Sequence, residues 1–384
     1  MDGTADVAVV GGGVFGLWVA QAAASAGLTV TLVEAGRIGA GASATPVGAL
    51  TPFPRAPEAR PDAAAEAMAA FQARGLLALP ARAAALREAT GRAPGYARTG
   101  RLMPVADAAQ RLRAEAIVAA GRARFARDPE GGAAHWALEP APPAAFAPCI
   151  AEAARGAGVL VDSVSARIDT AAWSGALVAA LAGRARLLED WPVARIDAAS
   201  RSISGPRGRI AAGHLVLAAG FATATFAPGL GLAPGRAVKG QAAWLAADLP
   251  DGLPVIQAPG LFLVRHGPGR VAIGATSEPG LTDPAPDAAL EPVLERARAL
   301  CPPLAGAAVT RAWGGIRPRP PGRMPQIGPV PGHPGLWLAT GGFKIGLAIA
   351  HIAGEDLVAA MLGRPGALPA AFAPAPAEAV RAAR

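Results

Sequence analysis

A glycine pattern near the start of the chain restricts its fold more than any other feature. Residues 6–10 (DVAVV) predict a short buried strand, and Gly11, Gly13 and Gly16 follow it with the spacing G-x-G-x-x-G. Residues 14–26 then predict a helix. In such a turn the glycines permit a tight bend, a close approach of backbone to a pyrophosphate, and close packing of helix on strand. The helix N-terminus offers N–H groups and the positive end of its dipole to phosphates.

The residues after this helix complete a β-α-β unit. Residues 28–34 (LTVTLVE) predict a second strand that ends in Glu34, 18 residues after Gly16. A carboxylate there accepts hydrogen bonds from ribose hydroxyls and repels a 2′-phosphate, which argues against NADP. The motif alone leaves FAD and NAD open. Small residues at 39–45 would let the backbone pass close to a pyrophosphate and a flavin, and they favour FAD.

The composition is that of a folded protein without a nucleic-acid partner. Of 384 residues, 52% are hydrophobic and 17% are charged, which suits a large core and excludes a disordered chain. The net charge is +8, but the arginines are scattered and aromatic residues make up only 5%. Lys239 and Lys344 are the only lysines, a pattern typical of codon bias that replaces Lys with Arg.

Cysteines, histidines and hydropathy give expectations about compartment and metals. Cys149 and Cys301 lie far apart in the chain, so we expect no disulfide framework or cysteine metal cluster, and a reducing compartment fits. Asp2 and Asp6 stand where a secretory signal would be basic and then apolar, and no run of about 18 apolar residues predicts a membrane span. The histidines show no metal-ligand spacing, and His351 is expected to pack in the last helix. The sequence therefore predicts a cytoplasmic protein without a metal site.

The remaining elements predict a fold of the α/β (α+β) class. We expect a Rossmann-like FAD-binding domain, with an inserted substrate domain built on an antiparallel sheet plus helices. The expected elements are an Ala-rich helix at 62–92 broken near Pro80, a helix at 105–127, a loop at 128–148, a strand at 213–220, an antiparallel pair (LFLV and RVAIGAT) within 238–280, a helix at 287–300, a strand at 335–340 and a helix at 345–362. The expected domains are discontinuous: 1–75, 150–225 and 310–384 for the cofactor, and 76–149 and 226–309 for the substrate.

Several ordered pieces of the chain resemble the D-amino acid oxidase superfamily of flavoenzymes. Beside the first motif they are AVKGQ at 237–241, LFLVRHGPGRVAIGATSEPG at 261–280, RAWGGIRPRPPGRMPQIGP at 311–329 and LWLATGGFKIGLAIAHIAGEDL at 336–357. The similarity runs over nearly the whole chain. It is strongest to the glycine oxidase branch, with sarcosine oxidase-like features.

The resemblance implies a set of residues around the cofactor FAD. Those implied at the pyrophosphate, ribose and flavin are Val14, Phe15, Glu34, Ala35, Ala42, Ser43, Val47, Gly48 and Ala49, with Val193 on the adenosine side. The loop and helix start beside the isoalloxazine ring would comprise Gly342, Phe343, Lys344, Ile345, Gly346, Leu347 and Ala348.

The resemblance also implies a substrate site. Arg317, in GGIRP, matches the arginine that holds the substrate carboxylate in glycine oxidases, and a guanidinium fork suits that task. Arg319 and Arg323 are expected to be solvated. The chain departs from the glycine oxidase pattern where Phe262 replaces a tyrosine, Ser277 a methionine and Lys344 a second arginine. A Gly-Phe-Lys run also occurs in sarcosine oxidase-like proteins, so Lys344 keeps a carboxylate role, whereas Lys239 has no assigned role.

The combined expectation is an FAD-dependent amine or amino acid oxidase or dehydrogenase. It would oxidise glycine, a D-amino acid or an N-methyl amino acid by hydride transfer from Cα to flavin N5. Its catalytic residues would be Arg317 and Lys344, and its acceptor oxygen or an electron carrier. Three alternatives remain open: a dehydrogenase that reduces a quinone or carrier, an NAD-linked dehydrogenase, and a non-catalytic flavoprotein subunit. A homo-oligomer is compatible with each of them.

Overall fold

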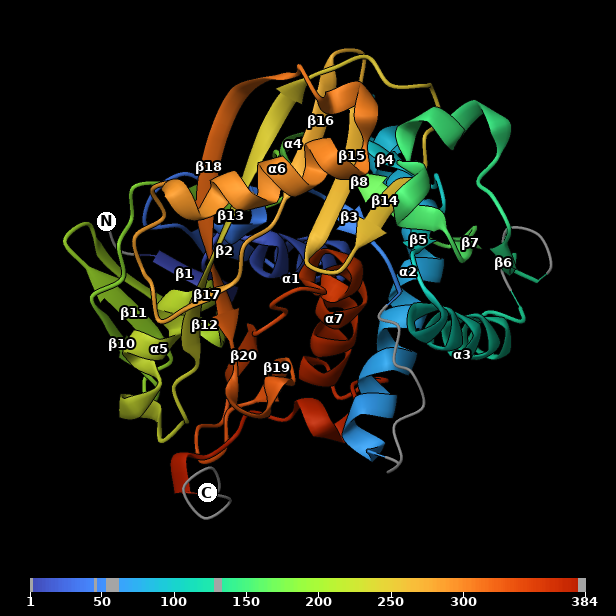
Figure 1. The fold of residues 1–384 in the computed structure, drawn as a ribbon. Helices are drawn as coiled ribbons and strands as arrows, with labels where there is room; N and C mark the ends of the chain where they lie inside the picture. Colours follow the sequence, from blue (N-terminus) through green and yellow to red (C-terminus); the bar gives the residue numbers. More distant parts are fainter. Residues whose placement is uncertain (1–2, 45–46, 53–61, 128–132, 379–384) are drawn as a thin grey trace.

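The computed structural model describes residues 3–44, 47–52, 62–127 and 133–378. Within these ranges the strands form two large sheets and one small sheet. Figure 1 shows helices α1 (Val14–Ser25) and α7 (Gly346–Met361) near the centre, with α2 (Ala63–Thr90) alongside α7. Among the helices so described, none is long and apolar enough to cross a membrane.

The first sheet has a parallel centre. In spatial order its parallel strands are β9 (Arg186–Leu188), β2 (Val30–Val33), β1 (Gly3–Val10), β12 (Gly208–Leu217) and β20 (Leu336–Thr340). Antiparallel strands β10 (Arg195–Asp197) and β11 (Ser202–Gly205) extend it beyond β12, and β19 (Gln326–Pro329) pairs with β20. This is the Rossmann-like sheet that the β-α-β pattern predicts.

Both faces of this sheet are buried, as in most parallel sheets. Along β1, Val7 and Val9 pack in the cluster that contains α1, α7 and α4 (Thr170–Leu181), whereas Ala8 and Val10 pack in a second cluster on the other face. The period of two residues explains this division, because successive side chains of a strand point to opposite faces.

The second sheet is mostly antiparallel. Its order is β17 (Glu278–Pro279), β13 (Arg236–Ala246), β16 (Arg270–Gly274), β15 (Leu261–Gly267), β14 (Val255–Ala258), β5 (Arg101–Val105), β7 (Gly158–Asp162) and β6 (Trp136–Glu139), with β18 (Ala308–Arg319) pairing with β13. The predicted pair across HGPG is confirmed as β15 and β16. Helix α6 (Glu291–Leu300) packs on this sheet. A small third sheet consists of β3 (Ala49–Leu50), β8 (Ala166–Ile168) and β4 (Tyr96–Ala97).

Two predictions about local structure are wrong. Helix α2 runs unbroken through Pro80, because Asp62 caps its N-terminus and buried residues on both sides, such as Leu76 and Leu86, hold it in the core. The expected loop at 128–148 contains β6 and a 3-10 helix at Ala144–Cys149. Trp136 orders this region by stacking on Phe125.

Two strands belong to a different large sheet than the predicted domain limits imply. Strand β7 falls within the stretch 150–225 expected in the cofactor domain, yet it pairs with β5 and β6 in the second sheet. Strand β18 continues past residue 310 but pairs with β13. The division into two discontinuous domains stays a prediction, and the sheets place β7 and β18 on the substrate side of it.

Candidate functional site

The glycine turn after β1 leaves no room for side chains. A Cβ at Gly16 would lie 1.9 Å from the carbonyl oxygen of Gly11, and a Cβ at Gly11 would lie 2.5 Å from that of Ala218 at the end of β12. Gly11 also has φ of 109°, a region that favours glycine. The turn therefore requires both glycines.

The N-terminus of α1 is open to an anionic group. Gly13 precedes the helix and has no side chain to cap it, and the first turn contains no acidic residue. The N–H of Val14 donates to Ser43 Oγ at 2.9 Å, so the 3-10 turn Ala42–Ala44 lies over this end of the helix. The positive end of the helix dipole and the small residues around it fit a pyrophosphate.

Glu34 lies beside the same turn. Its carboxylate accepts hydrogen bonds from the N–H of Gly12 at 2.7 Å and of Gly36 at 3.0 Å, and it is half-buried. A carboxylate has about four acceptor sites, so two remain for hydroxyl donors. The carbonyl of Glu34 accepts from the N–H of Trp191 at 2.8 Å, which brings the segment with Val193 to this side of the sheet. Ala35 is exposed next to it.

The C-terminal loop meets the glycine turn through Phe15. A Cβ at Gly342 would lie 2.6 Å from the Phe15 ring, and one at Gly346 would lie 3.4 Å from it. Phe343 has φ of 42°, and α7 begins at Gly346. Two segments from opposite ends of the chain thus form one site, with the N-termini of α1 and α7 both beside it. Residues 342–348, which the family resemblance implies at the flavin ring, form this loop and the start of α7.

Residues 47–49 form a third side of the site. Gly48 has φ of 60°, and a Cβ there would lie 2.0 Å from the carbonyl oxygen of Ile168. His266 Nε2 lies 3.1 Å from the carbonyl oxygen of Val47, and burial lowers the pKa of His266 to about 4, so the ring is neutral at neutral pH. Phe262 packs in the same small cluster as Val47 and Ala49. Sequence reasoning missed His266, because its partner is a backbone atom more than 200 residues away.

The guanidinium of Arg317 lies against the backbone of Gly240. A Cβ at Gly240 would lie only 2.0 Å from Arg317 Nη2 and 2.1 Å from Cζ, so the guanidinium occupies the space over Gly240. Strand pairing of β13 with β18 brings these residues together. Arg317 Nη1 donates to the carbonyl oxygen of Thr276 at 3.0 Å, and burial lowers the pKa of Arg317 although the charge of Glu278 opposes this shift. Gly240 and Thr276 were not expected in the site, since only the sheet reveals their position.

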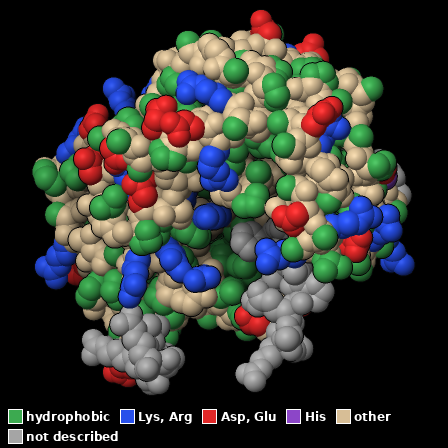
Figure 2. Space-filling view, viewed as in Figure 1, with side chains coloured by type: hydrophobic (Ala, Val, Ile, Leu, Met, Phe, Trp, Pro, Cys, Tyr) green, Lys and Arg blue, Asp and Glu red, His purple; other side chains and the backbone are tan. Residues whose placement is uncertain are grey.

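Three cationic side chains lie near one another at this end of β18. Burial, and then the charges of Arg317 and Arg319, lower the pKa of Lys344. The Arg319 guanidinium and the Lys344 ammonium lie 5.9 Å and 5.6 Å from the centre of the Phe343 ring. The expectation that Arg319 is a solvated arginine is wrong, because it is half-buried against this ring. Arg323 is exposed, as expected. Figure 2 shows Lys and Arg side chains around a hollow in this face of the molecule.

The two remaining expected substrate residues differ in exposure. Ser277 is exposed and follows Thr276 directly, whereas Phe262 is half-buried on β15, where it pairs with Gly274. His351 packs as predicted, with no exposed surface and its Nε2 3.0 Å from the carbonyl oxygen of Gly75. Over the described ranges, no three His, Cys, Asp or Glu residues are grouped as metal ligands.

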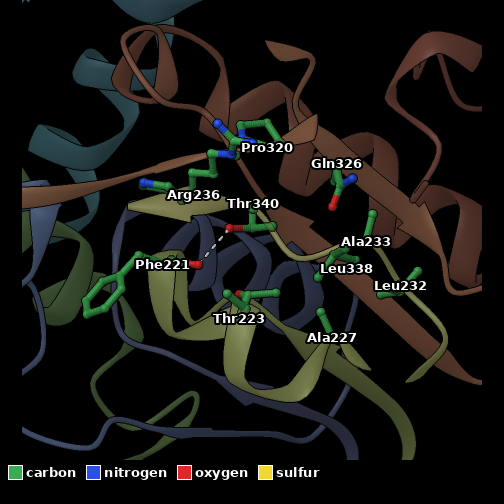
Figure 3. A pocket seen from close by; sticks show the side chains of 15 residues that line it. Phe221, Thr223, Ala227, Leu232, Ala233, Arg236, Pro320, Gln326, Leu338 and Thr340 are labelled. Carbon is green, nitrogen blue, oxygen red and sulfur yellow. Dashed lines mark hydrogen bonds between the residues drawn. The ribbon is translucent and has the colours of Figure 1, made fainter. Parts of the chain in front are cut away.

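A small cavity lies behind the C-terminal loop. It has a volume of about 20 Å³ and is lined by residues that include Thr223, Pro320, Gln326, Thr340 and Gly341. Figure 3 shows Thr340 donating to the carbonyl oxygen of Gly220, at 3.2 Å, on one wall of this cavity. The cavity is large enough for a single water molecule and too small for an amino acid.

The two cysteines lie close together although they are far apart in the sequence. Cys149 and Cys301 are both buried in one hydrophobic cluster, and their thiols are hydrogen-bonded, which lowers the pKa of Cys149 and raises that of Cys301. Both are free thiols. The N–H of Ala151 donates to the carbonyl of Leu300 and joins the two segments that carry them.

Comparison with known proteins agrees with this geometry. The family described as FAD dependent oxidoreductase matches residues 6–361. Glycine oxidase of Geobacillus kaustophilus (strain HTA426) is 31% identical over 373 residues, which cover 92% of each chain. Glycine oxidase of Pseudomonas putida is 40% identical over 146 residues, 37% of this chain and 40% of that one. The matched stretch of the Pseudomonas aeruginosa glycine oxidase likewise spans 48% of that protein.

Solved structures have the same fold. The crystal structure of glycine oxidase from Geobacillus kaustophilus has a TM-score of 0.84 at 27% identity, over 96% of this chain and 98% of that one. Iminodiacetate oxidase from Chelativorans sp. BNC1 has a TM-score of 0.81 at 24% identity, over 96% and 99%. The fold is thus that of a flavin-dependent oxidoreductase. The chain belongs to the FAD dependent oxidoreductase family, and its similarity to the Geobacillus kaustophilus glycine oxidase extends over 92% of its length.

Proposed function

We propose that this enzyme oxidises the amine next to the carboxylate of a small amino acid. Glycine, a D-amino acid and an N-methyl amino acid are the substrate classes that the proposal covers. The observation that carries it is the guanidinium of Arg317, which lies over Gly240 and makes a single hydrogen bond to the protein among the described residues. A guanidinium has five donors, so four remain for a ligand.

The chain's own residues would position the substrate for oxidation. Bound FAD supplies a hydride acceptor. Arg317 would bind the carboxylate through two parallel hydrogen bonds, and Lys344 would add a second positive charge on the side of the C-terminal loop. Phe262 and Ser277 would limit the room for the substrate side chain. Because carboxylate capture fixes Cα in place, much of the catalysis would come from positioning.

The residues around the glycine turn would hold the cofactor. The open N-terminus of α1 would take the pyrophosphate, with Ser43 beside it, and Glu34 would accept the ribose hydroxyls. The segment 342–348 would lie against the flavin ring. The match to the family described as FAD dependent oxidoreductase supports FAD as the cofactor.

An anaerobic screen for flavin bleaching tests the proposed reaction. The compounds tested would be glycine, sarcosine, D-alanine, D-proline and iminodiacetate. Each would be compared with the corresponding amine that lacks the carboxylate. Bleaching by an amino acid supports the proposal. A flavin that no carboxylate-bearing amine bleaches would refute it and would favour a non-catalytic flavoprotein. Oxygen uptake with peroxide release would then identify an oxidase, and its absence a dehydrogenase that reduces a carrier.

Arg317→Ala tests the residue that the proposal depends on. The variant should keep FAD but lose about tenfold or more in kcat/KM, because a charge-assisted hydrogen bond contributes about 1.5–3 kcal/mol. Arg323→Ala, at an exposed arginine nearby in sequence, is the matched control and should retain activity. If Arg317→Ala slows the oxidation of an amino acid and of its decarboxylated amine equally, Arg317 is not the carboxylate anchor.

The cytoplasmic location stays a prediction, which cell fractionation would test.

A further inference from the structure

A buried lysine holds the segment that borders Arg317. Lys239 has an exposed fraction of 2%, and its Nζ donates to Asp287 Oδ2 at 2.6 Å. The carboxylate of Asp287 raises the pKa of Lys239, and the ammonium lowers the pKa of Asp287. Lys239 is one of two lysines in a chain where arginine is otherwise used, and the other is Lys344 of the candidate site.

Gln241 extends this ion pair into a network. It is fully buried, its Nε2 donates to Asp287 Oδ1 at 2.8 Å, and its Oε1 accepts from the N–H of Asp287 at 2.7 Å. The same Nε2 donates to Glu278 at 2.9 Å. Asp287 also accepts from the N–H of Ala289 and so caps the turn that leads into α6. One carboxylate is thus fixed by three donors.

The network continues to the guanidinium of Arg317. The N–H of Gln241 donates to Thr276 Oγ1 at 2.8 Å, and the N–H of Thr276 donates to the carbonyl of Gln241 at 3.2 Å. The carbonyl of Thr276 then accepts from Arg317 Nη1 at 3.0 Å. An unbroken series of hydrogen bonds therefore joins Lys239, through Asp287, Gln241 and Thr276, to Arg317.

Apart from this network, the segment joins β13 through the short strand β17 and a few backbone hydrogen bonds. Residues 281–289 are all exposed, and the strand before them, β17, has two residues. A Cβ at Gly314 would lie 2.4 Å from the carbonyl oxygen of Pro284, so the segment passes directly over β18. Loss of the Lys239–Asp287 pair would remove one of the three donors that fix the Asp287 carboxylate, while Gln241 and the pairing of β17 with β13 would still hold the segment.

We propose that Lys239 is a positioning residue for the substrate carboxylate. It fixes Asp287 and, through Gln241 and Thr276, sets the position of the Arg317 guanidinium. The inference rests on the proposed function, since it assumes that Arg317 binds the carboxylate. The inference also gives a reason for lysine at position 239. The Cε atom of Lys239 lies 3.6 Å from where a Cβ on Gly314 would be, so the compact ammonium fits beside β18, whereas a broader guanidinium would crowd that strand.

The experiment compares Lys239→Met with Lys239→Arg, Asp287→Asn and a control, Arg82→Met. Lys239→Met keeps length and loses charge, and Asp287→Asn keeps hydrogen-bonding capacity if the first variant folds poorly. Arg82→Met breaks an ion pair with Glu355 between α2 and α7. Three quantities are measured in FAD-loaded protein: hydrogen exchange of residues 276–290, the Kd of glycolate by calorimetry, and kcat and KM for the amino acid that bleaches the flavin.

Lys239→Met and Asp287→Asn should speed exchange over 276–290 and weaken glycolate binding. They should also raise KM on the order of tenfold, with a smaller change in kcat, which is the expected scale for a displaced binding group. Lys239→Arg should restore charge but recover binding only in part, and Arg82→Met should change none of these values. Faster exchange with unchanged glycolate Kd and KM would overturn the inference, because the network would then support the fold alone. If Arg317→Ala leaves glycolate binding intact, the proposed function fails instead, whatever the Lys239 variants do.

Discussion

A methyl group at Gly240 would displace Arg317 without altering the arginine itself. In Gly240→Ala the new Cβ would lie 2.0 Å from Nη2, 2.1 Å from Cζ and 2.4 Å from Nη1 of Arg317. An ordinary non-bonded contact is roughly 3.5 Å, so the guanidinium has to move by about 1.5 Å. It is the far end of a flexible side chain, and the backbone around it can stay in place. The fold and the bound FAD should therefore survive.

The cost of this movement follows from what the guanidinium is proposed to bind. Loss of one charge-assisted hydrogen bond is worth about 1.5–3 kcal/mol, and about 1.4 kcal/mol corresponds to a factor of ten in rate. A reacting group misplaced by about 1 Å can cost on the order of a hundredfold. We expect kcat/KM for the amino acid to fall about ten- to hundredfold, measured by steady-state kinetics, with FAD content unchanged.

Gly175→Ala is the matched control for this substitution. Gly175 lies in α4, where a Cβ would meet no atom within 4 Å, so the variant adds the same methyl group at a place with room for it. It should have wild-type kinetics. Full activity of Gly240→Ala toward the amino acid would refute the assignment of Arg317, because the guanidinium cannot stay where the structure places it.

Three further predictions concern the cofactor, the second cation and acid stability. Glu34→Arg should weaken FAD binding in a titration of the apoprotein, since it replaces an acceptor held by Gly12 with a bulky donor; equal affinity would remove Glu34 from the ribose site. Wild-type affinity for glycolate should fall as pH rises through the lowered pKa of Lys344, because the ammonium loses its charge there, and Lys344→Met should abolish that pH limb; a limb that persists in the variant would belong to another group. The pKa of His266 is about 4 in the folded protein and near 6.5 when unfolded, so the unfolded state binds more protons below pH 6.5. The contribution of this ring to the free energy of unfolding should therefore be fully present above pH 6.5 and fall by about 3 kcal/mol as pH drops to 4. Urea titrations at several pH values should show a shallower fall of the unfolding free energy with decreasing pH for His266→Gln; equal slopes in the two proteins would contradict the burial of this ring.

The first β-α-β unit could be predicted because its signals are local. The glycine spacing, the short apolar run of β1 and the terminal Glu34 all lie within about 30 residues, and the structure has the corresponding strand, helix and strand. The antiparallel pair of β15 and β16 was predictable for the same reason, since its turn separates two clear strand patterns.

The parts that could not be predicted depend on contacts between distant segments. Nothing near Gly240 in the sequence indicates that Arg317 lies over it, because this depends on the pairing of β13 with β18. Arg319 resembled a solvated residue in a proline-rich turn until the loop with Phe343 was placed beside it. Pro80 was expected to end a helix, but burial of the residues around it outweighs the lost hydrogen bond.

The packing of α1 on α7 has a consequence for the synthesis of the protein. A Cβ at Gly354 in α7 would lie 2.8 Å from the backbone of Trp18 in α1, so the two helices touch at their backbones. While a ribosome makes the chain, α1 emerges long before α7, because about 320 residues separate the two helices. The apolar face of α1 stays without its cover for most of that time, and contacts between such distant segments form slowly. The nucleotide site is therefore complete only after α7 has been made and has packed on α1.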